Sequence, residues 1–68
     1  MTPPDLIFAM DRIGMTVSDL ARIVGRSERM IHHYRRGRYP IPVEIALIVS
    51  AMRDGKISIE YVTNFIKG

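Results

Sequence analysis

Two helix starts and a tight turn lie within residues 16–37, TVSDLARIVGRSERMIHHYRRG. Thr16 and Ser27 can each cap a helix, because a hydroxyl oxygen accepts a hydrogen bond from a backbone N–H of the first helical turn. Gly25 lies between them, and glycine takes the positive φ that reverses a chain within one residue. Gly37 can end the second helix. The stretch therefore predicts two short helices joined by a tight turn, and this unit constrains the rest of the fold.

Similar signals predict three further helices and no strand. Thr2 can cap a first helix, which ends at Gly14. Pro42 suits the first position of a fourth helix, which is apolar on nearly all sides, so we expect that helix to be buried on more than one side. Ser58 can cap a last helix, and the expected fold is an all-α single domain of five helices over residues 1–68. Its core should be formed by apolar residues at helical spacing: Leu6, Ala9, Met10, Ile13, Leu20, Ala21, Val24, Met30, Ile31 and Tyr34.

The length and composition limit the class of protein. A chain of 68 residues allows one domain near the lower size limit for a core that folds unaided. The absence of cysteine excludes a disulfide framework and a thiolate metal site. No segment reaches the ~18 consecutive apolar residues of a membrane span, and the first residues lack the basic region of a secretory signal. We therefore expect a cytoplasmic protein stabilised by packed helices, with a second subunit as one way to complete the core.

Positive charge is concentrated in one short block. Residues 26–38 contain five arginines and a single acid, Glu28, whereas the rest of the chain carries five basic and six acidic residues. A basic block on a nearly neutral body is typical of a surface that binds a polyanion. A solvated arginine-rich surface is the alternative, although the planar guanidinium group suits bidentate contacts better than solubility alone requires.

The second helix of the 16–37 stretch can present one side to a partner. If Ile31 and Tyr34 face inward, the polar residues one, three and four positions apart face outward. We expect these outward residues to contact base edges in the major groove of DNA: Glu28, Arg29, His32, His33 and Arg36. Arg29 is the first choice for reading a guanine, since arginine binds that base in a bidentate manner. Phosphate contacts are expected from helix starts and from the end of this helix with the loop after it: Ser18, Arg26, Ser27, Arg35, Arg38 and Tyr39.

Other kinds of site have weaker support. Glu28 and His32 could share a metal ion, but no third ligand with suitable spacing is evident. No nucleophile, base and orienting group form a recognisable set, so we expect neither an enzyme nor a bound cofactor or metal. Aromatic residues are too few to form an RNA-stacking platform. A small helical module or adaptor that binds an acidic protein through the basic surface is the alternative to DNA binding.

The same stretch resembles the helix-turn-helix of Cro/C1-type DNA-binding proteins, also called the XRE family. The resemblance consists of Ala21 four residues before Gly25, Ile31 six residues after it, the aromatic Tyr34, and Gly37. It implies a lambda repressor-like fold of five helices and sequence-specific binding to double-stranded DNA, with residues 28–36 as the recognition helix.

The resemblance has two departures and one narrower form. Arg26 stands where the family has a small apolar residue, so its side chain must turn outward or contact a phosphate. Glu28 stands where glutamine is common; it can accept from a cytosine amino group or serve as a dipole partner at the helix N-terminus. The order of the residue pair before Tyr34, the segment RYPIP and an apolar helix is similar to small phage-borne anti-CRISPR-associated regulators. That similarity implies an autorepressor of an anti-CRISPR operon.

A single domain of this size offers few contacts for tight specific binding to DNA. Two copies with recognition helices one DNA turn (~34 Å) apart would solve this, so we expect a homodimer that represses transcription from an inverted-repeat operator. The apolar surface of the fourth and last helices is the expected dimer interface, with intramolecular core as its alternative. The candidate residues are Ile57, Ile59, Val62, Phe65 and Ile66.

Overall fold

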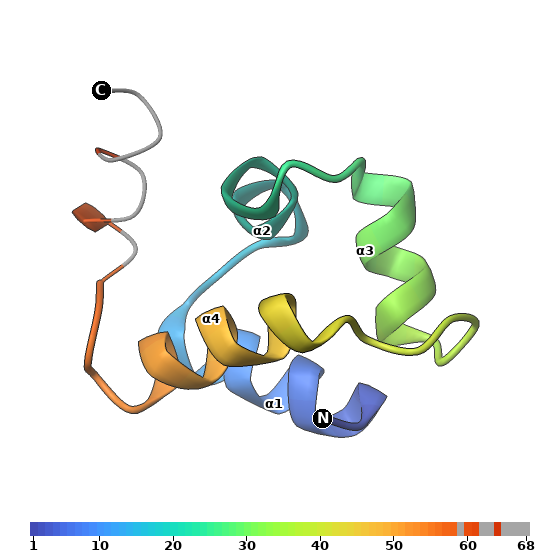
Figure 1. The fold of residues 1–68 in the computed structure, drawn as a ribbon, viewed down its shortest axis with the longest axis horizontal. Helices are drawn as coiled ribbons and strands as arrows, with labels where there is room; N and C mark the ends of the chain where they lie inside the picture. Colours follow the sequence, from blue (N-terminus) through green and yellow to red (C-terminus); the bar gives the residue numbers. More distant parts are fainter. Residues whose placement is uncertain (59, 62–63, 65–68) are drawn as a thin grey trace.

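The computed structural model describes residues 1–58, 60, 61 and 64, and this part of the chain is all-helical (Figure 1). It contains four helices and no strand: α1 (Pro3–Ile13), α2 (Val17–Val24), α3 (Glu28–Arg35) and α4 (Val43–Arg53). Helix α1 packs against both α4 and α3, and α2 packs against α3. The α-helical prediction and the four helix positions are therefore confirmed, and α3 lies at one edge of the molecule.

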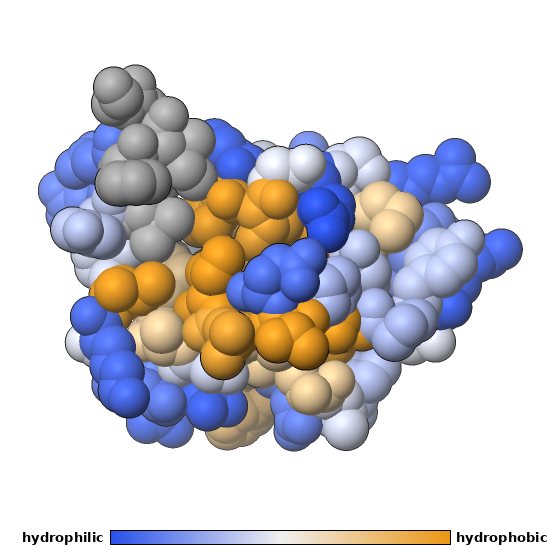
Figure 2. Space-filling view, in the orientation of Figure 1, coloured by the Kyte–Doolittle hydropathy of each residue, from blue (hydrophilic) through white to orange (hydrophobic). Residues whose placement is uncertain are grey.

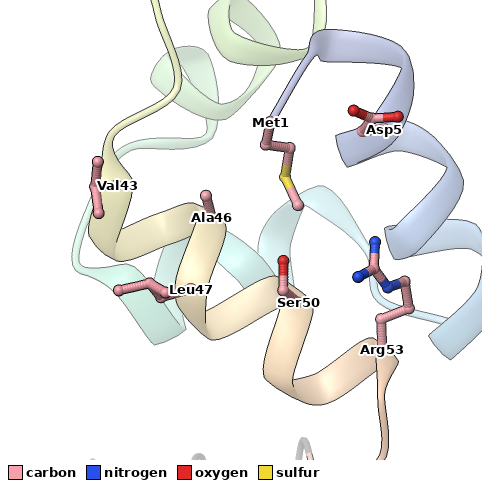
Figure 3. A pocket seen from close by; sticks show the side chains of 7 residues that line it. All are labelled: Met1, Asp5, Val43, Ala46, Leu47, Ser50 and Arg53. Atoms are coloured by element: carbon pink, nitrogen blue, oxygen red, sulfur yellow. The ribbon is translucent and has the colours of Figure 1, made fainter.

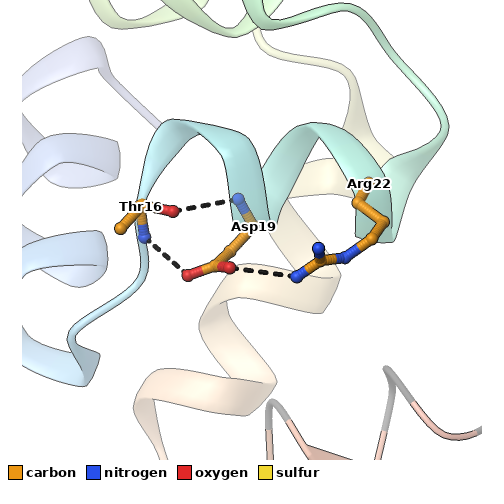
Figure 4. Close-up of polar contacts among 3 residues, drawn as sticks. All are labelled: Thr16, Asp19 and Arg22. Atoms are coloured by element: carbon orange, nitrogen blue, oxygen red, sulfur yellow. Dashed lines mark hydrogen bonds and ion pairs between the residues drawn. The ribbon is translucent and has the colours of Figure 1, made fainter.

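Local hydrogen bonds explain where the first three helices begin. The Thr16 hydroxyl oxygen accepts from the backbone N–H of Asp19 at 3.0 Å, and the Asp19 carboxylate accepts from the backbone N–H of Thr16 at 3.1 Å (Figure 4). Thr2 and Asp5 form the same reciprocal capping box at the start of α1. The hydrogen bond from the Thr16 backbone, followed by that with its side chain, lowers the pKa of Asp19. These helix starts depend on neighbours three residues apart, which is why the sequence reveals them.

One core joins the four helices. Seven of the ten residues expected in it are buried, and the other three, Ile13, Val24 and Met30, pack against it while partly exposed. The buried residues are Leu6, Ala9, Met10, Met15, Leu20, Ala21, Ile23, Ile31, Tyr34, Ile45, Val49 and Met52.

 Met15 and Ile23 belong to this core although their spacing did not single them out, because Met15 lies in the link between α1 and α2 and no helical period applies there.

The expectation for the fourth helix needs two corrections. Pro42 is not its first residue but precedes it, with α4 beginning at Val43. The helix is also not buried on more than one side: Ile45, Val49 and Met52 are buried, while Val43 is 72% exposed and Leu47 is 65% exposed. The described elements leave the outer side of α4 uncovered. An evenly apolar helix has no polar side from which its orientation could be predicted.

The expected count of five helices is not matched, since the described structure contains four. Ser58 does accept a hydrogen bond from the backbone N–H of Tyr61 at 3.0 Å, the contact expected of a capping serine. The expected interface residues of the last helix lie outside the described residues: Ile59, Val62, Phe65 and Ile66. Ile57, the remaining candidate, is half-buried and packs against the core.

Candidate functional site

The turn between α2 and α3 holds α3 in a defined orientation. Gly25 has φ 69°, and the N–H of Arg26 donates to the carbonyl of Ala21 at 3.0 Å. The Ser27 hydroxyl oxygen then accepts from the backbone N–H of Met30 at 3.1 Å and starts α3. On the inner side of α3, Ile31 is completely buried. Both the start and the inner side of α3 are thus held by the rest of the fold.

The outer side of α3 carries an exposed basic row. Arg29, His32 and Arg36 follow one another at spacings of three and four residues, and all three side chains are exposed, as is Glu28 beside them. In the described part of the chain, the ion pairs involve Arg22, Arg26 and Arg53. The arginines of this row are therefore not neutralised by any ion pair that the structure describes. We call Arg29, His32 and Arg36 the basic row. Together with Glu28, they are four of the five expected base contacts, and all four lie on the same side of α3.

The loop after α3 brings further basic groups to the C-terminal end of α3. Gly37 has φ 77°, and a Cβ at this position would lie 3.3 Å from the Pro3 side chain, so glycine allows the loop to pass close to α1. The N–H of Arg38 donates to the carbonyl of His33 at 2.9 Å and folds the loop back on α3. Arg38 and Tyr39 are both exposed beside the end of the helix, while Arg35 is half-buried on its flank.

His33 occupies a different environment from the basic row. Its ring meets the ring of Tyr39 edge-on, with centroids 5.3 Å apart and planes at 90°. Its Nδ1 atom is buried and has no hydrogen-bond partner among the described residues. Loss of hydration on burial, followed by the charges of Arg38, Arg29, Arg36 and His32, lowers the pKa of His33 below its usual 6.5. Of the five expected base contacts, His33 is therefore the one that lies apart from the basic row, with its ring against Tyr39 of the following loop.

Acidification should destabilise the protein through His33. Folding lowers the pKa of His33, so protonation of this side chain reduces the free energy of unfolding. The stability is fully present above the pKa of the unfolded chain, near 6.5, and it is lost as the pH falls through the lower pKa of the folded protein. We expect the thermal midpoint to fall as the pH is lowered from 7 toward 5. His33→Phe keeps an aromatic ring against Tyr39 but cannot titrate, so its midpoint should fall less over this range. Equal slopes for the two proteins would show that His33 does not carry the effect.

Arg26 makes a contact that spacing along the sequence did not reveal. Its guanidinium group lies 3.3 Å from the Glu44 carboxylate and links the α2–α3 turn to the first turn of α4. The side chain thus leaves the turn, as expected for a residue that replaces a small apolar one. Because both side chains are largely exposed, the pair contributes little stability. The structure thus places Arg26 in an ion pair with Glu44, whereas the arginines of the basic row are in none that it describes.

The two serines expected to contact phosphate are placed differently. Ser27 already uses its hydroxyl oxygen as an acceptor in the cap of α3, which leaves the hydroxyl hydrogen available to a phosphate oxygen. Ser18 is exposed in the first turn of α2, near the free N–H groups of that helix.

The described residues contain few alternatives to this site. They include no group of three or more histidine or acidic side chains placed to hold a metal ion. None of the described helices is both long and apolar enough to cross a membrane. A shallow hollow between the start of α1 and α4 is open and carries no cluster of reactive groups (Figure 3). Among the described residues, the basic row and the loop after it therefore form the densest group of exposed charged side chains.

Comparison of this chain with models of protein families, with curated proteins and with solved structures found no match. The geometry therefore carries the functional argument by itself. It presents a rigidly held helix whose outer side offers planar hydrogen-bond donors and positive charge.

Proposed function

We propose that the protein is a sequence-specific, double-stranded DNA-binding regulator of the Cro/C1 helix-turn-helix type. The observation that carries the proposal is the basic row, which is exposed on one side of α3 while the other side is anchored in the core. An α-helix fits the major groove of B-DNA, where arginine donors can bind the O6 and N7 atoms of guanine. Residues 28–36 would then form the recognition helix, with Arg29 and Arg36 at the bases.

Phosphate contacts would come from the flanks of the recognition helix. Arg35, Arg38 and Tyr39 lie at its C-terminal end, where they can bind the backbone of one strand and position the helix. Ser27 lies at its N-terminal end, where the partial positive charge of the helix also favours a phosphate. Contacts at both ends fix the register of the helix, and the basic row supplies the sequence preference.

The regulator would act as a dimeric repressor. A lone recognition helix reads only a few base pairs. Two copies on an inverted repeat are therefore needed to bind the operator much more tightly than random DNA. Repression follows if the bound protein occludes a promoter. The narrower resemblance to anti-CRISPR-associated regulators would make the repressed operon one that encodes an anti-CRISPR protein.

Selection of bound duplexes from a random pool tests the proposal. We expect a recovered inverted repeat, and binding to random duplex DNA that weakens steeply as salt is raised. If no duplex is bound at low salt, DNA binding is wrong. The basic surface would then be better explained by an acidic protein partner.

Arg29→Ala should relax the preference at one operator position and cost about 1–3 kcal/mol in binding free energy. The reason is that a bidentate contact to guanine is lost while the helix stays anchored by Ile31. Arg12→Ala is the matched control, because Arg12 is exposed in the last turn of α1, outside the recognition unit. Fluorescence anisotropy with each single-base operator variant measures the preference. Uniform weakening over all sequences would make Arg29 a phosphate contact instead.

A further inference from the structure

The outer side of α4 carries exposed apolar residues, and none of the other helices that the structure describes covers it. Val43 and Leu47 are its most exposed residues, and the smaller Ala46 and Ser50 lie next to them on the same helix (Figure 3). Figure 2 shows hydrophobic side chains gathered over α4 and toward α2 on this side of the molecule, with hydrophilic side chains among them. We call Val43, Ala46, Leu47 and Ser50 the α4 face. Full burial of a valine or leucine side chain contributes about 1.5–3 kcal/mol, so covering this face would be favourable.

The α4 face lacks the charge that would argue for a charged partner. The acid at the start of the helix, Glu44, is paired with Arg26, and Arg53 at its end is paired with Asp54. Asp5 and Arg53, which carry opposite charges, line the hollow beside the face. In a two-fold pair in which each residue meets its own copy, like charges at the centre would repel each other. The α4 face itself carries only apolar and small residues, and the Glu44 carboxylate beside it is paired with Arg26, which suits such a pair.

The position of the α4 face relative to α3 indicates which partner fits it. In the common orientation of Figures 1 and 2, the hydrophobic area faces the viewer, whereas α3 lies at one edge and α4 directs its N-terminal end toward that edge. A two-fold axis running along the α4 face toward that edge would therefore place both copies of α3 on the same side. That arrangement is required of a dimer that puts two recognition helices on one duplex.

The dimensions agree with this arrangement. The molecule is thinnest along the viewing direction, with a Cα extent of 19 Å. Packed helices are separated by about 8–10 Å, so two copies joined through α4 have their centres roughly 28 Å apart. This is of the same order as the ~34 Å between half-sites one DNA turn apart. We propose, on the basis of the proposed function, that the α4 face pairs with the α4 face of a second copy when two copies bind adjacent half-sites.

The size of the face sets the strength of the pairing. Eleven helical residues span about 16 Å, so one helix face buries far less than the ~800 Å² per partner of a standard stable interface. The pair is therefore weak in free solution and forms at micromolar concentration only when DNA holds both copies together. Its signature is cooperative binding to the full operator.

Leu47→Gln tests the pairing on DNA. The substitution makes the centre of the face polar at an exposed position, so the monomer should stay folded. We expect affinity for a single half-site to change less than twofold, while affinity for the full inverted repeat falls at least tenfold and cooperativity is lost. Phe8→Gln is the matched control, because Phe8 is also 65% exposed but lies on α1 outside the face. Retained cooperativity in Leu47→Gln, or equal losses in both variants, would overturn the proposal.

Leu47→Cys separates this proposal from the proposed function. The chain has no cysteine, so the introduced thiol can form a disulfide only with its own copy. Under mild oxidation we expect a cross-linked dimer with full-site DNA at micromolar protein, and without DNA at millimolar protein; Phe8→Cys should give neither. If the protein binds no DNA but Leu47→Cys still cross-links at high concentration, the pairing stands and the DNA-binding function fails. Absence of the cross-link in both conditions would overturn the pairing.

Discussion

Arg29→Glu combined with Arg36→Glu should reduce affinity for duplex DNA at least a hundredfold. Both side chains are exposed in the basic row and neither is held in an ion pair that the structure describes, so the fold should tolerate the change. Each exchange removes two units of positive charge, which lowers the formal net charge from +3 to −1. Phosphates that attracted this side of α3 would then repel it.

The matched control for this reversal is Arg12→Glu combined with Lys56→Glu. Arg12 lies in the last turn of α1 and Lys56 follows α4, and both are exposed, so the net charge changes equally while the basic row stays intact. We expect the control to weaken binding by less than tenfold at 0.1–0.15 M salt, where charges more than about 8–10 Å apart are largely screened. Anisotropy titrations over a range of salt concentrations measure both effects. Equal losses would mean that total charge, and not the position of the row, governs binding.

Ile31→Ala should lower the free energy of unfolding by about 2–5 kcal/mol, the usual cost of truncating a fully buried isoleucine. Ile31 is the completely buried residue of α3 and packs in the core that joins the four helices. Small domains lie at the low end of the usual 5–15 kcal/mol of stability, so the variant should be partly unfolded near 37 °C.

Urea unfolding followed by circular dichroism measures this loss. Leu47→Ala provides the control, because it removes a side chain of similar size from an exposed position and should change stability by less than about 0.5 kcal/mol. If Ile31→Ala were as stable as the original protein, α3 would not be anchored through this residue. The DNA affinity of Ile31→Ala, measured at a temperature where it is folded, should stay close to that of the original protein because the basic row is unchanged.

Sequence reasoning performed well where the interactions are local. The caps at Thr2, Thr16 and Ser27 and the turn at Gly25 each depend on residues within about four positions, and all four appear in the structure. The separation of buried Ile31 from the basic row follows in the same way from the helical repeat of α3. These features could be predicted because backbone geometry relates such neighbours before any tertiary contact forms.

Sequence reasoning did not reveal the contacts that depend on how the helices and loops pack. His33 lies at helical spacing compatible with the outer side of α3, yet its ring is turned toward Tyr39 because the following loop folds back on the helix. Arg26 and Glu44 are 18 positions apart, and only the approach of α4 to the turn brings them into contact. No local pattern encodes either contact.

The stretch of residues 16–37 determined by itself that two helices meet at a glycine turn and that the second carries the basic row. Its caps, turn and helical period are local, so they need no knowledge of the remaining fold. Only the tertiary structure decided which side of α4 is exposed, because a helix with apolar residues all round can bury any side. Packing against α1 buries Ile45, Val49 and Met52 and leaves Val43 and Leu47 outside. The orientation of an evenly apolar helix is set by its neighbours, and from that orientation the proposed pairing surface follows.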